Sequence, residues 1–171
     1  MIKLFSSARS KSIICLALPV FLFCNFNSTS AQTISKKWIN QNLQYAARQY
    51  KVLMQKIPEG VMPESFQNGK LKTCNSSDWV AGFFPGTLLY LYESTGNKTL
   101  YNGALKKIVL MDNEQYDTGT HDLGFMMYCS YGNLFRIWPD DKYKQILLTS
   151  ARSLSTRFNP KVGCIRSSGE V

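Results

Sequence analysis

The sequence predicts an all-α protein, and two observations lead to that prediction. Apolar residues recur three and four positions apart in successive stretches, which is the spacing of amphipathic helices. No stretch shows the convincing apolar–polar alternation of a β-strand. Of the 171 residues, 44% are hydrophobic and 13% are aromatic. This is the composition of a globular protein, and the length suits one domain.

The order of residues in 1–31 is that of a secretory signal peptide. A basic start is followed by an apolar run over residues 13–26 and then by small residues that end at Ala31. The basic residues are Lys3, Arg9 and Lys11. Cleavage after Ala31 would leave one domain over residues 32–171, in the periplasm or outside the cell.

Two other interpretations of this segment stay open. The apolar run could be an uncleaved anchor, although it is shorter than the roughly 20 residues that span a bilayer. Alternatively, Cys24 could carry a lipid, although residues 21–23 are bulkier than the small residues that usually precede such a site. We expect no stable membrane span.

Turn residues divide the remaining chain into five expected helices. The first covers residues 34–57, where apolar positions keep the helical period until Pro58 and Gly60. A loop through Asn68-Gly69 follows. Ser77 or Asp78 then caps a second helix that continues through 87–94, with Pro85 tolerated near its first turn.

The other three helices follow at short intervals. Gly96-Asn97 ends the second helix, and residues 98–111 form the third. After a polar loop, Thr120 or Asp122 starts a fourth helix that runs to about residue 137. A turn at Pro139-Asp140 leads into the fifth, which ends near residue 158. Short turns between helices are typical of stacked antiparallel helix pairs.

Charge and cysteine content exclude some classes of site. The net charge is +9, and three of the 20 basic residues lie in the predicted signal peptide, so the domain carries about +6. These charges are scattered, which indicates a solvated surface with at most a modest attraction to a polyanion. A secreted location favours an acidic polysaccharide over nucleic acid.

Three cysteines lie outside the predicted signal peptide: Cys74, Cys129 and Cys164. An odd number with wide spacing is a poor disulfide framework, so we expect buried free thiols, although one bridge is possible. With one histidine in the whole chain, a structural zinc site is not expected.

Residues 118–125 are the most informative stretch. His121 stands next to Asp122, where a polar loop enters an apolar helix. Judged by spacing alone, Asp122 is an ordinary N-cap, a common role for aspartate. The alternative is an acid at a helix start, with apolar neighbours that tune its pKa for proton transfer. Gly124 inside the helix start suggests close packing or the approach of a ligand.

Residues 78–86 place aromatic side chains at a second junction between a loop and a helix. Trp79, Phe83 and Phe84 could stack on sugar rings or could fill the core. Gly82 and Gly86 beside them allow a close helix contact in either case. A third segment carries Arg157 and Arg166, which could hold a carboxylate through a bidentate fork or bind structural groups instead.

Taken together, these segments resemble the unsaturated glucuronyl hydrolases of glycoside hydrolase family 88. The matching stretches occur in family order over about 90 residues. They are Asp78-Trp-x-x-Gly-Phe-Phe-Pro-Gly86 followed by Leu-Tyr-x-Tyr-Glu-x-Thr-Gly96, His121-Asp-Leu-Gly-Phe125 with Ser130-Tyr-Gly132, and Ala151-Arg-Ser-Leu154 with Arg157-Phe-Asn-Pro160 and Ile165-Arg-Ser167.

The resemblance implies an (α/α)6 toroid of six helical hairpins that needs no metal or organic cofactor. It implies removal of a 4,5-unsaturated uronic acid from oligosaccharides made by polysaccharide lyases. In such enzymes an acid protonates the vinyl-ether double bond, water adds at C5, and the hemiketal collapses to release the sugar. By this resemblance Asp122 is catalytic, and the substrate contacts are His121, Trp79, Phe84 and Arg166.

The sequence departs from the family near its end. The family's principal acid/base aspartate lies further along than this chain reaches, and Ser168 and Gly169 stand where a tryptophan usually follows. Five helices would make an incomplete toroid with exposed apolar surface, so we expect the chain alone to be inactive and poorly soluble. A non-catalytic carbohydrate-binding or scaffold remnant is the alternative. An adaptor built from helical repeats is disfavoured, because no 34-residue period is visible.

Overall fold

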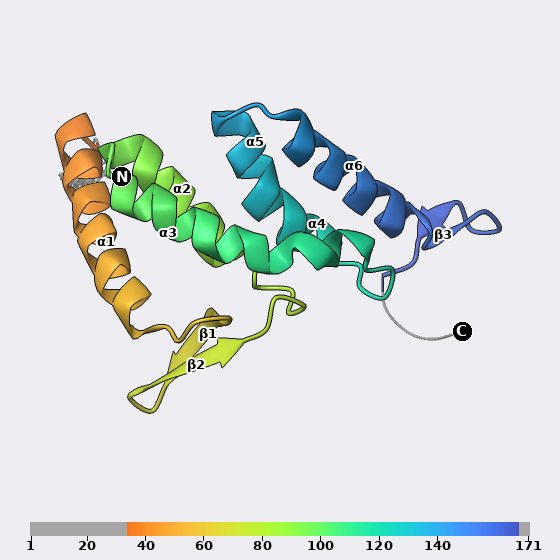
Figure 1. The fold of residues 1–171 in the computed structure, drawn as a ribbon, viewed down its shortest axis with the longest axis horizontal. Coiled ribbons are helices and arrows are strands. Elements are labelled where there is room, and N and C mark those ends of the chain that lie inside the picture. The colour runs from red at the N-terminus through yellow and green to blue at the C-terminus, as the bar shows by residue number, and fades with distance from the viewer. Residues whose placement is uncertain (1–33, 168–171) are drawn as a thin grey trace, which may run out of the picture. The chain divides into compact units, whose positions relative to one another are not determined.

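Five continuous helical segments account for most of residues 34–167, the part of the chain that the computed structural model describes (Figure 1). Three of them are the single helices α1 (Lys36–Lys56), α2 (Phe83–Thr95) and α6 (Asp141–Ser155). The fourth is α3 (Lys98–Ile108), which continues as the 3-10 segment η1 (Val109–Tyr116). The fifth is α4 (Leu123–Met127), which continues through the π-helical η2 (Tyr128–Gly132) into α5 (Asn133–Ile137). The predicted signal peptide over 1–31 lies outside the described residues. No helix within 34–167 is both long and apolar enough to cross a membrane.

Two β-hairpins depart from the all-α prediction. Strands β1 (Met62–Gln67) and β2 (Lys70–Cys74) pair antiparallel where a loop was expected. The turn is Asn68-Gly69, and both residues have positive φ, 50° and 75°. That backbone is the one a two-residue hairpin turn requires, and Asn-Gly is its strongest sequence signal. The short strands β3 (Phe158–Asn159) and β4 (Cys164–Ile165) form the second hairpin after α6.

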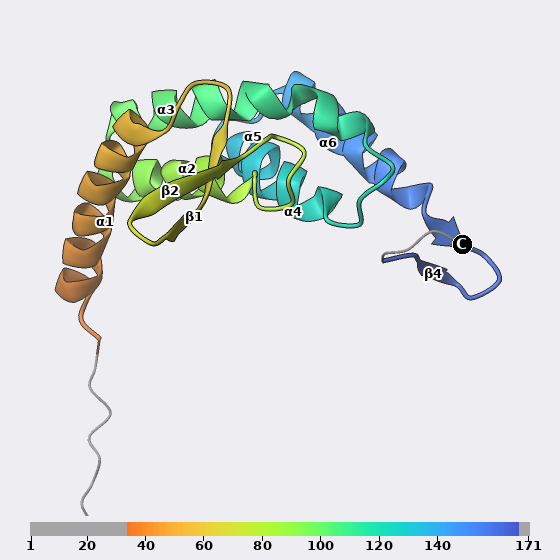
Figure 2. The ribbon, with the colours of Figure 1, turned by 90° about the horizontal axis from the view of Figure 1, so that it is seen from below.

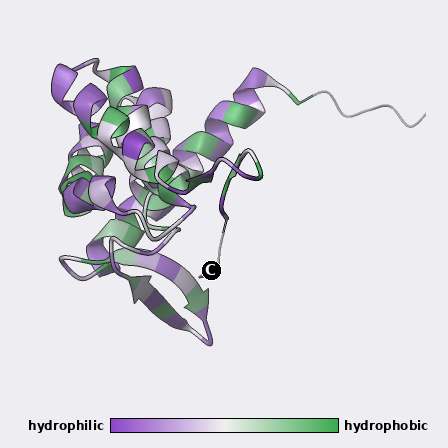
Figure 3. Ribbon diagram, turned by 90° about the vertical axis from the view of Figure 1, so that its right-hand side faces the viewer, coloured by the Kyte–Doolittle hydropathy of each residue, from purple (hydrophilic) through white to green (hydrophobic). Residues whose placement is uncertain are grey.

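The helical segments form two layers. The first layer holds α2 and the α4–α5 segment: α2 contacts both η2 and α5, and α2, α4 and α5 lie below α3 in Figure 2. α3 with η1 lies over α2 and α4, and α6 packs on η1 and α4. α1 packs against α2 and α3. Along α1, hydrophobic and hydrophilic residues alternate at the helical period (Figure 3), so its inner stripe meets α2 while its other side faces solvent.

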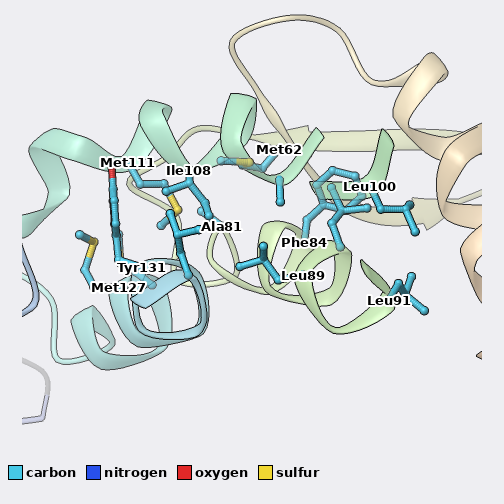
Figure 4. Packing of buried hydrophobic residues seen from close by; sticks show 14 of the residues in the cluster. Met62, Ala81, Phe84, Leu89, Leu91, Leu100, Ile108, Met111, Met127 and Tyr131 are labelled. Atoms are coloured by element: carbon cyan, nitrogen blue, oxygen red, sulfur yellow. The ribbon is translucent and has the colours of Figure 1, made fainter. Parts of the chain in front are cut away.

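α2 is the element most enclosed by the others, and it is apolar on several sides as a result. Six of its thirteen residues are buried: Phe84, Pro85, Gly86, Leu88, Leu89 and Leu91. Phe84 and the three leucines join one hydrophobic cluster that runs through both layers (Figure 4). The β1–β2 hairpin adds the fully buried Met62, and the α4–α5 segment adds Met126, Met127 and Tyr131. The Tyr131 hydroxyl donates a hydrogen bond to the carboxylate of Asp112 in η1.

Two glycines let α2 approach the α4–η2 segment. A Cβ on Gly82 would overlap the backbone carbonyls of Phe125 and Met126, and one on Gly86 would overlap the carbonyl of Cys129. Because Gly82 meets Met126 and Gly86 meets Cys129, the two helices run side by side in the same direction. The close contact expected at these glycines is confirmed.

Substituting these glycines therefore tests the helix contact. We expect Gly82→Ala and Gly86→Ala each to lower the free energy of unfolding by about 2–4 kcal/mol, because the facing atoms are backbone and cannot move aside. Gly124→Ala is the matched control. A Cβ there meets nothing within 4 Å, so stability should stay the same or rise by up to about 1 kcal/mol. Urea unfolding followed by circular dichroism measures all three, and equal effects would contradict the proposed contact.

Candidate functional site

The N-terminal ends of α2 and α4 lie together, since these two helices are parallel and in close contact. Residues at the start of each helix are thereby brought to one place, although more than thirty positions separate them in the chain. Unpaired backbone N–H groups at a helix start carry partial positive charge. At the start of α2 the Phe83 N–H already donates to the Val80 carbonyl and Pro85 has no N–H, so the start of α4 is the end that favours an anionic ligand. The residues around it include aromatic rings and one carboxylate.

Three aromatic rings form an exposed cluster at this place. The Trp79 and Phe83 ring centroids are 5.8 Å apart and perpendicular. Phe125 meets the edges of both rings, with centroids 6.4 Å from Trp79 and 5.9 Å from Phe83. Trp79 is 51% exposed and Phe125 is 52% exposed. Apolar rings that stay this open at a helix junction present flat faces to solvent, which suits contact with a sugar ring.

Phe84 does not take part in this cluster, which corrects its assignment as a substrate contact. Its ring is 5% exposed and stacks on Tyr50 of α1, with centroids 5.8 Å apart. The reason is helical geometry: Phe83 and Phe84 point in directions about 100° apart, so only one of them can face outward. Phe83 occupies the surface position and Phe84 belongs to the core.

Asp122 stands at the N-cap position of α4, but its carboxylate does not cap the helix. No capping hydrogen bond from its side chain occurs in the described structure, and the residue has φ −85° and ψ 5°. Its backbone N–H donates to Thr120 Oγ1 at 3.0 Å, so the hydroxyl of Thr120 fixes this turn. The capping interpretation of Asp122 is therefore wrong for its side chain, although right for its place in the helix.

The carboxylate of Asp122 is instead turned toward His121. The distance from His121 Nε2 to Asp122 Oδ1 is 3.5 Å, and the two side chains are 44% and 20% exposed. Asp122 also lies three residues before Phe125, a spacing that places both on one face of the helix start. The acid is thus half-buried, accessible from outside, and on the side of the helix that carries the aromatic cluster.

The loop before Asp122 is fastened by a buried arginine. Arg157 is 8% exposed and donates from Nη1 to the carbonyl oxygens of Thr118 and Gly119, at 3.0 Å and 2.7 Å. Its Nε and Nη2 donate to the carbonyls of Arg166 and Ser167, at 3.0 Å and 3.1 Å. Of the two alternatives that the sequence left open for Arg157, the structure shows the structural one.

Arg166 lies in the segment that Arg157 holds, directly after β4, and it is exposed. Its backbone N–H donates to the Arg157 carbonyl at 3.0 Å. Its guanidinium remains a candidate for binding a carboxylate. Thus Trp79, His121 and Asp122 gather near the paired helix starts, Arg166 is tied to the loop before Asp122 through Arg157, and Phe84 is absent from the site.

Two cavities border this region. One of about 350 Å³ lies between the β1–β2 hairpin, α1 and α2, and Phe83 is part of its wall. A second of about 160 Å³ lies between α4 and α6, where Gly124 is exposed. The expectation of close packing at Gly124 is not met within the described residues. No group of three or more His, Cys, Asp or Glu residues within 34–167 is arranged to hold a metal ion.

The sequence left Phe83 open between a sugar contact and the core, whereas Phe84 was the ring assigned to the site and Phe125 was not assigned. The three-residue spacing from Asp122 to Phe125 would have identified Phe125, because it puts this ring on the helix face that carries Asp122.

No protein-family model matches the chain. An unsaturated glucuronyl hydrolase of Formosa agariphila is 42% identical over 93 residues, which cover 54% of this chain and 23% of that protein. The unsaturated chondroitin disaccharide hydrolase of Streptococcus agalactiae is 26% identical over 145 residues, 83% of this chain and 36% of that one. A crystal structure of an unsaturated glucuronyl hydrolase specific for heparin matches with a TM-score of 0.74 and 40% identity, over 80% of this chain and 37% of the other.

The chain is therefore related to unsaturated glucuronyl hydrolases in sequence and in fold, and the resemblance inferred from its motifs is confirmed. Its helical layers match part of the α/α toroid of those enzymes. The chain spans less than two fifths of the length of each of these three relatives.

The role of Asp122 in stability can be separated from a role in function. We expect Asp122→Ala to change the free energy of unfolding by less than about 0.5 kcal/mol, because no capping bond is lost. Asp140 is the matched control, since its Oδ1 accepts from the Lys142 N–H at 2.7 Å and caps α6. Asp140→Ala should cost about 1 kcal/mol. Thermal unfolding compares them, and an equal loss for both would show that Asp122 is a structural cap.

The three free thiols should differ in reactivity. Burial raises the pKa of Cys74 to about 11, with further contributions from Asp78 and Glu64, and burial also raises the pKa of Cys129. Cys164 is exposed, contrary to the expectation of buried thiols. Because the thiolate is the nucleophile, iodoacetamide at about pH 8 should label Cys164 first and Cys74 last. Peptide mass spectrometry reads the order, and early labelling of Cys74 would contradict its burial.

Proposed function

We propose that this chain is part of a glycoside hydrolase of the unsaturated glucuronyl hydrolase type. Such an enzyme removes a 4,5-unsaturated uronic acid from the non-reducing end of oligosaccharides produced by polysaccharide lyases. One observation carries the proposal: the carboxylate of Asp122 stands at a helix start without capping it, three residues before Phe125, which belongs to an exposed cluster of aromatic rings.

A carboxylate in this position suits proton transfer. It is partly shielded, has His121 beside it, and is not engaged by the backbone N–H groups that would otherwise hold it. General acids and bases need such accessible but partly desolvated surroundings. We assign the catalytic role to Asp122 and a supporting contact to His121.

The neighbouring groups suit a uronate. The rings of Trp79, Phe83 and Phe125 offer apolar faces to the sugar. The carboxylate of the uronate would be stabilised by the N-terminal end of α4 and by the guanidinium of Arg166. Two of the relatives act on heparin and on a chondroitin disaccharide, so we propose an acidic polysaccharide fragment as the substrate and leave its repeat unit open.

The proposed reaction consumes one water molecule. A proton adds to C4 of the C4=C5 bond, and the hydroxyl of water adds to C5. The hemiketal at C5 then opens: the bond from C5 to the ring oxygen breaks, C5 becomes a ketone, and the former ring oxygen is protonated to the hydroxyl of a hemiacetal at C1. This hemiacetal collapses to an aldehyde at C1, while the bond from C1 to the glycosidic oxygen breaks and that oxygen takes the proton, so that the remaining sugar leaves as an alcohol. Asp122 is proposed to exchange the proton with the substrate, together with a second carboxylate that the family resemblance places beyond the end of this sequence.

We further propose that the five helical segments form part of an (α/α)6 ring. The parallel inner pair and the outer helices over it are consistent with that arrangement. A periplasmic or secreted location is also proposed. It is supported by the signal-peptide pattern of residues 1–31, and a secreted enzyme would meet the fragments that lyases release.

Binding to the purified 171-residue chain tests the proposal. An unsaturated chondroitin disaccharide should change the fluorescence of the exposed Trp79. Trp79→Ala should weaken binding of this disaccharide, measured by calorimetry, roughly tenfold, because the sugar loses its stacking contact with the indole ring. Trp138, also 55% exposed but at the end of α5, provides the control variant Trp138→Ala. If the unaltered chain binds neither the unsaturated chondroitin disaccharide nor its heparin counterpart, the proposal is refuted.

Turnover is a separate measurement. The ultraviolet absorbance of the conjugated double bond falls as it is hydrated, so it reports the reaction directly. We expect the 171-residue chain to bind without measurable turnover, as the family resemblance implies. If a longer form of the protein turns the substrate over, Asp122→Asn should reduce its rate by about two to four orders of magnitude, the usual contribution of a general acid. An unchanged rate would remove Asp122 from the mechanism.

A further inference from the structure

Arg157 is the only charged residue in the buried part of residues 34–167. All four of its hydrogen-bond acceptors are backbone carbonyl oxygens, and no carboxylate pairs with it in the described structure. Burying a charge is costly unless its donors are satisfied. Because Arg157 is buried for backbone contacts alone, its role is to hold these four carbonyl groups in place.

The four carbonyls belong to two different segments. Those of Thr118 and Gly119 lie in the loop that ends at Asp122. Those of Arg166 and Ser167 lie directly after β4. The guanidinium stands between the two segments and holds them at one separation. Each segment carries one of the two charged groups assigned to the substrate above, namely Asp122 and Arg166.

The loop transmits this constraint to Asp122. Asp117 Oδ1 accepts from the Gly119 N–H at 2.6 Å, and Thr120 Oγ1 accepts from the Asp122 N–H at 3.0 Å. Two consecutive side-chain turns of this kind leave the loop little freedom. Fixing its carbonyls at 118 and 119 consequently fixes the start of α4. On the other side, the Arg157 carbonyl accepts from the Arg166 N–H, which adds a backbone hydrogen bond to the segment after β4.

We propose that Arg157 is a positioning residue, one that sets the distance between the acid at Asp122 and the carboxylate-binding group at Arg166. This inference rests on the proposed function. With the uronate carboxylate held by Arg166, the C4=C5 bond next to it is placed toward Asp122. Arg157 itself does not touch the substrate. It acts by keeping the segments at 118–119 and 166–167 in register, although they are far apart in the chain.

Only arginine can make this set of contacts. Its planar fork carries five N–H donors that point in fixed, diverging directions, whereas the lysine ammonium has three donors on one atom. Lysine at position 157 would keep the charge and much of the volume. It would reach one segment or the other and would lose the connection between them.

A double-mutant cycle tests the proposal. Binding of the unsaturated chondroitin disaccharide to the 171-residue chain is measured by calorimetry for the unaltered chain, Arg157→Lys, Arg166→Ala and the double variant. We expect each single change to weaken binding, by about fivefold and about tenfold respectively. The double variant should bind no more weakly than Arg166→Ala alone, since Arg157 acts through Arg166. Arg152→Lys, an exposed arginine on α6, should leave binding unchanged.

Fully additive effects, or unaltered binding by Arg157→Lys, would overturn the positioning role while leaving the proposed function intact. A chain that does not bind the disaccharide at all would overturn both. If Arg157→Lys does not fold, hydrogen exchange of the unaltered chain decides. The disaccharide should protect backbone amides of residues 117–122 and 164–167 together, because they are fastened to one guanidinium. Protection of only one segment would refute the coupling.

Discussion

The close approach of α2 to the α4–η2 segment is the constraint on which the candidate site depends. Gly82 and Gly86 allow it, because any side chain there would meet the carbonyls of Phe125, Met126 and Cys129. The approach makes two helices start at one place. This brings Trp79 and Phe83 to Phe125 and sets all three near Asp122. The start of α2 serves both the core and the site, since the same helix turn exposes Phe83 and buries Phe84.

The helical part of the fold could be predicted because its signals are local. Pro58, Gly96 and Pro139 end periodic stretches, and the structure has its helix boundaries close to them. The β1–β2 hairpin was missed because its strands lack regular alternation: Phe66 is 72% exposed, and Met62 is fully buried. Its Asn68-Gly69 turn was visible in the sequence, but a turn signal alone does not show whether the flanking residues pair.

The site was predicted in part, for a physical reason that differs from residue to residue. Trp79 and Asp122 stand at junctions between loop and helix, and such junctions are readable from the sequence. Whether Phe83 or Phe84 faces outward depends on the exact residue at which α2 begins. The sequence does not fix that residue, and Phe84 was therefore wrongly assigned to the site. The contacts of Arg157 join segments far apart in the chain, and no local pattern indicates them. That the Asp122 side chain leaves the helix uncapped depends on its conformation, which the sequence does not show.

The π-helical turn η2 joins α4 to α5 and holds one residue more than an α-helical turn of the same length would. Each residue turns a helix by roughly 100°. Deleting one position between Tyr128 and Gly132 would therefore rotate the start of α4 against α5 by about a quarter turn. Asp122 and Phe125 would swing away from Trp79 even though none of these side chains had changed. The length of this turn, as much as its composition, constrains how the sequence can diverge.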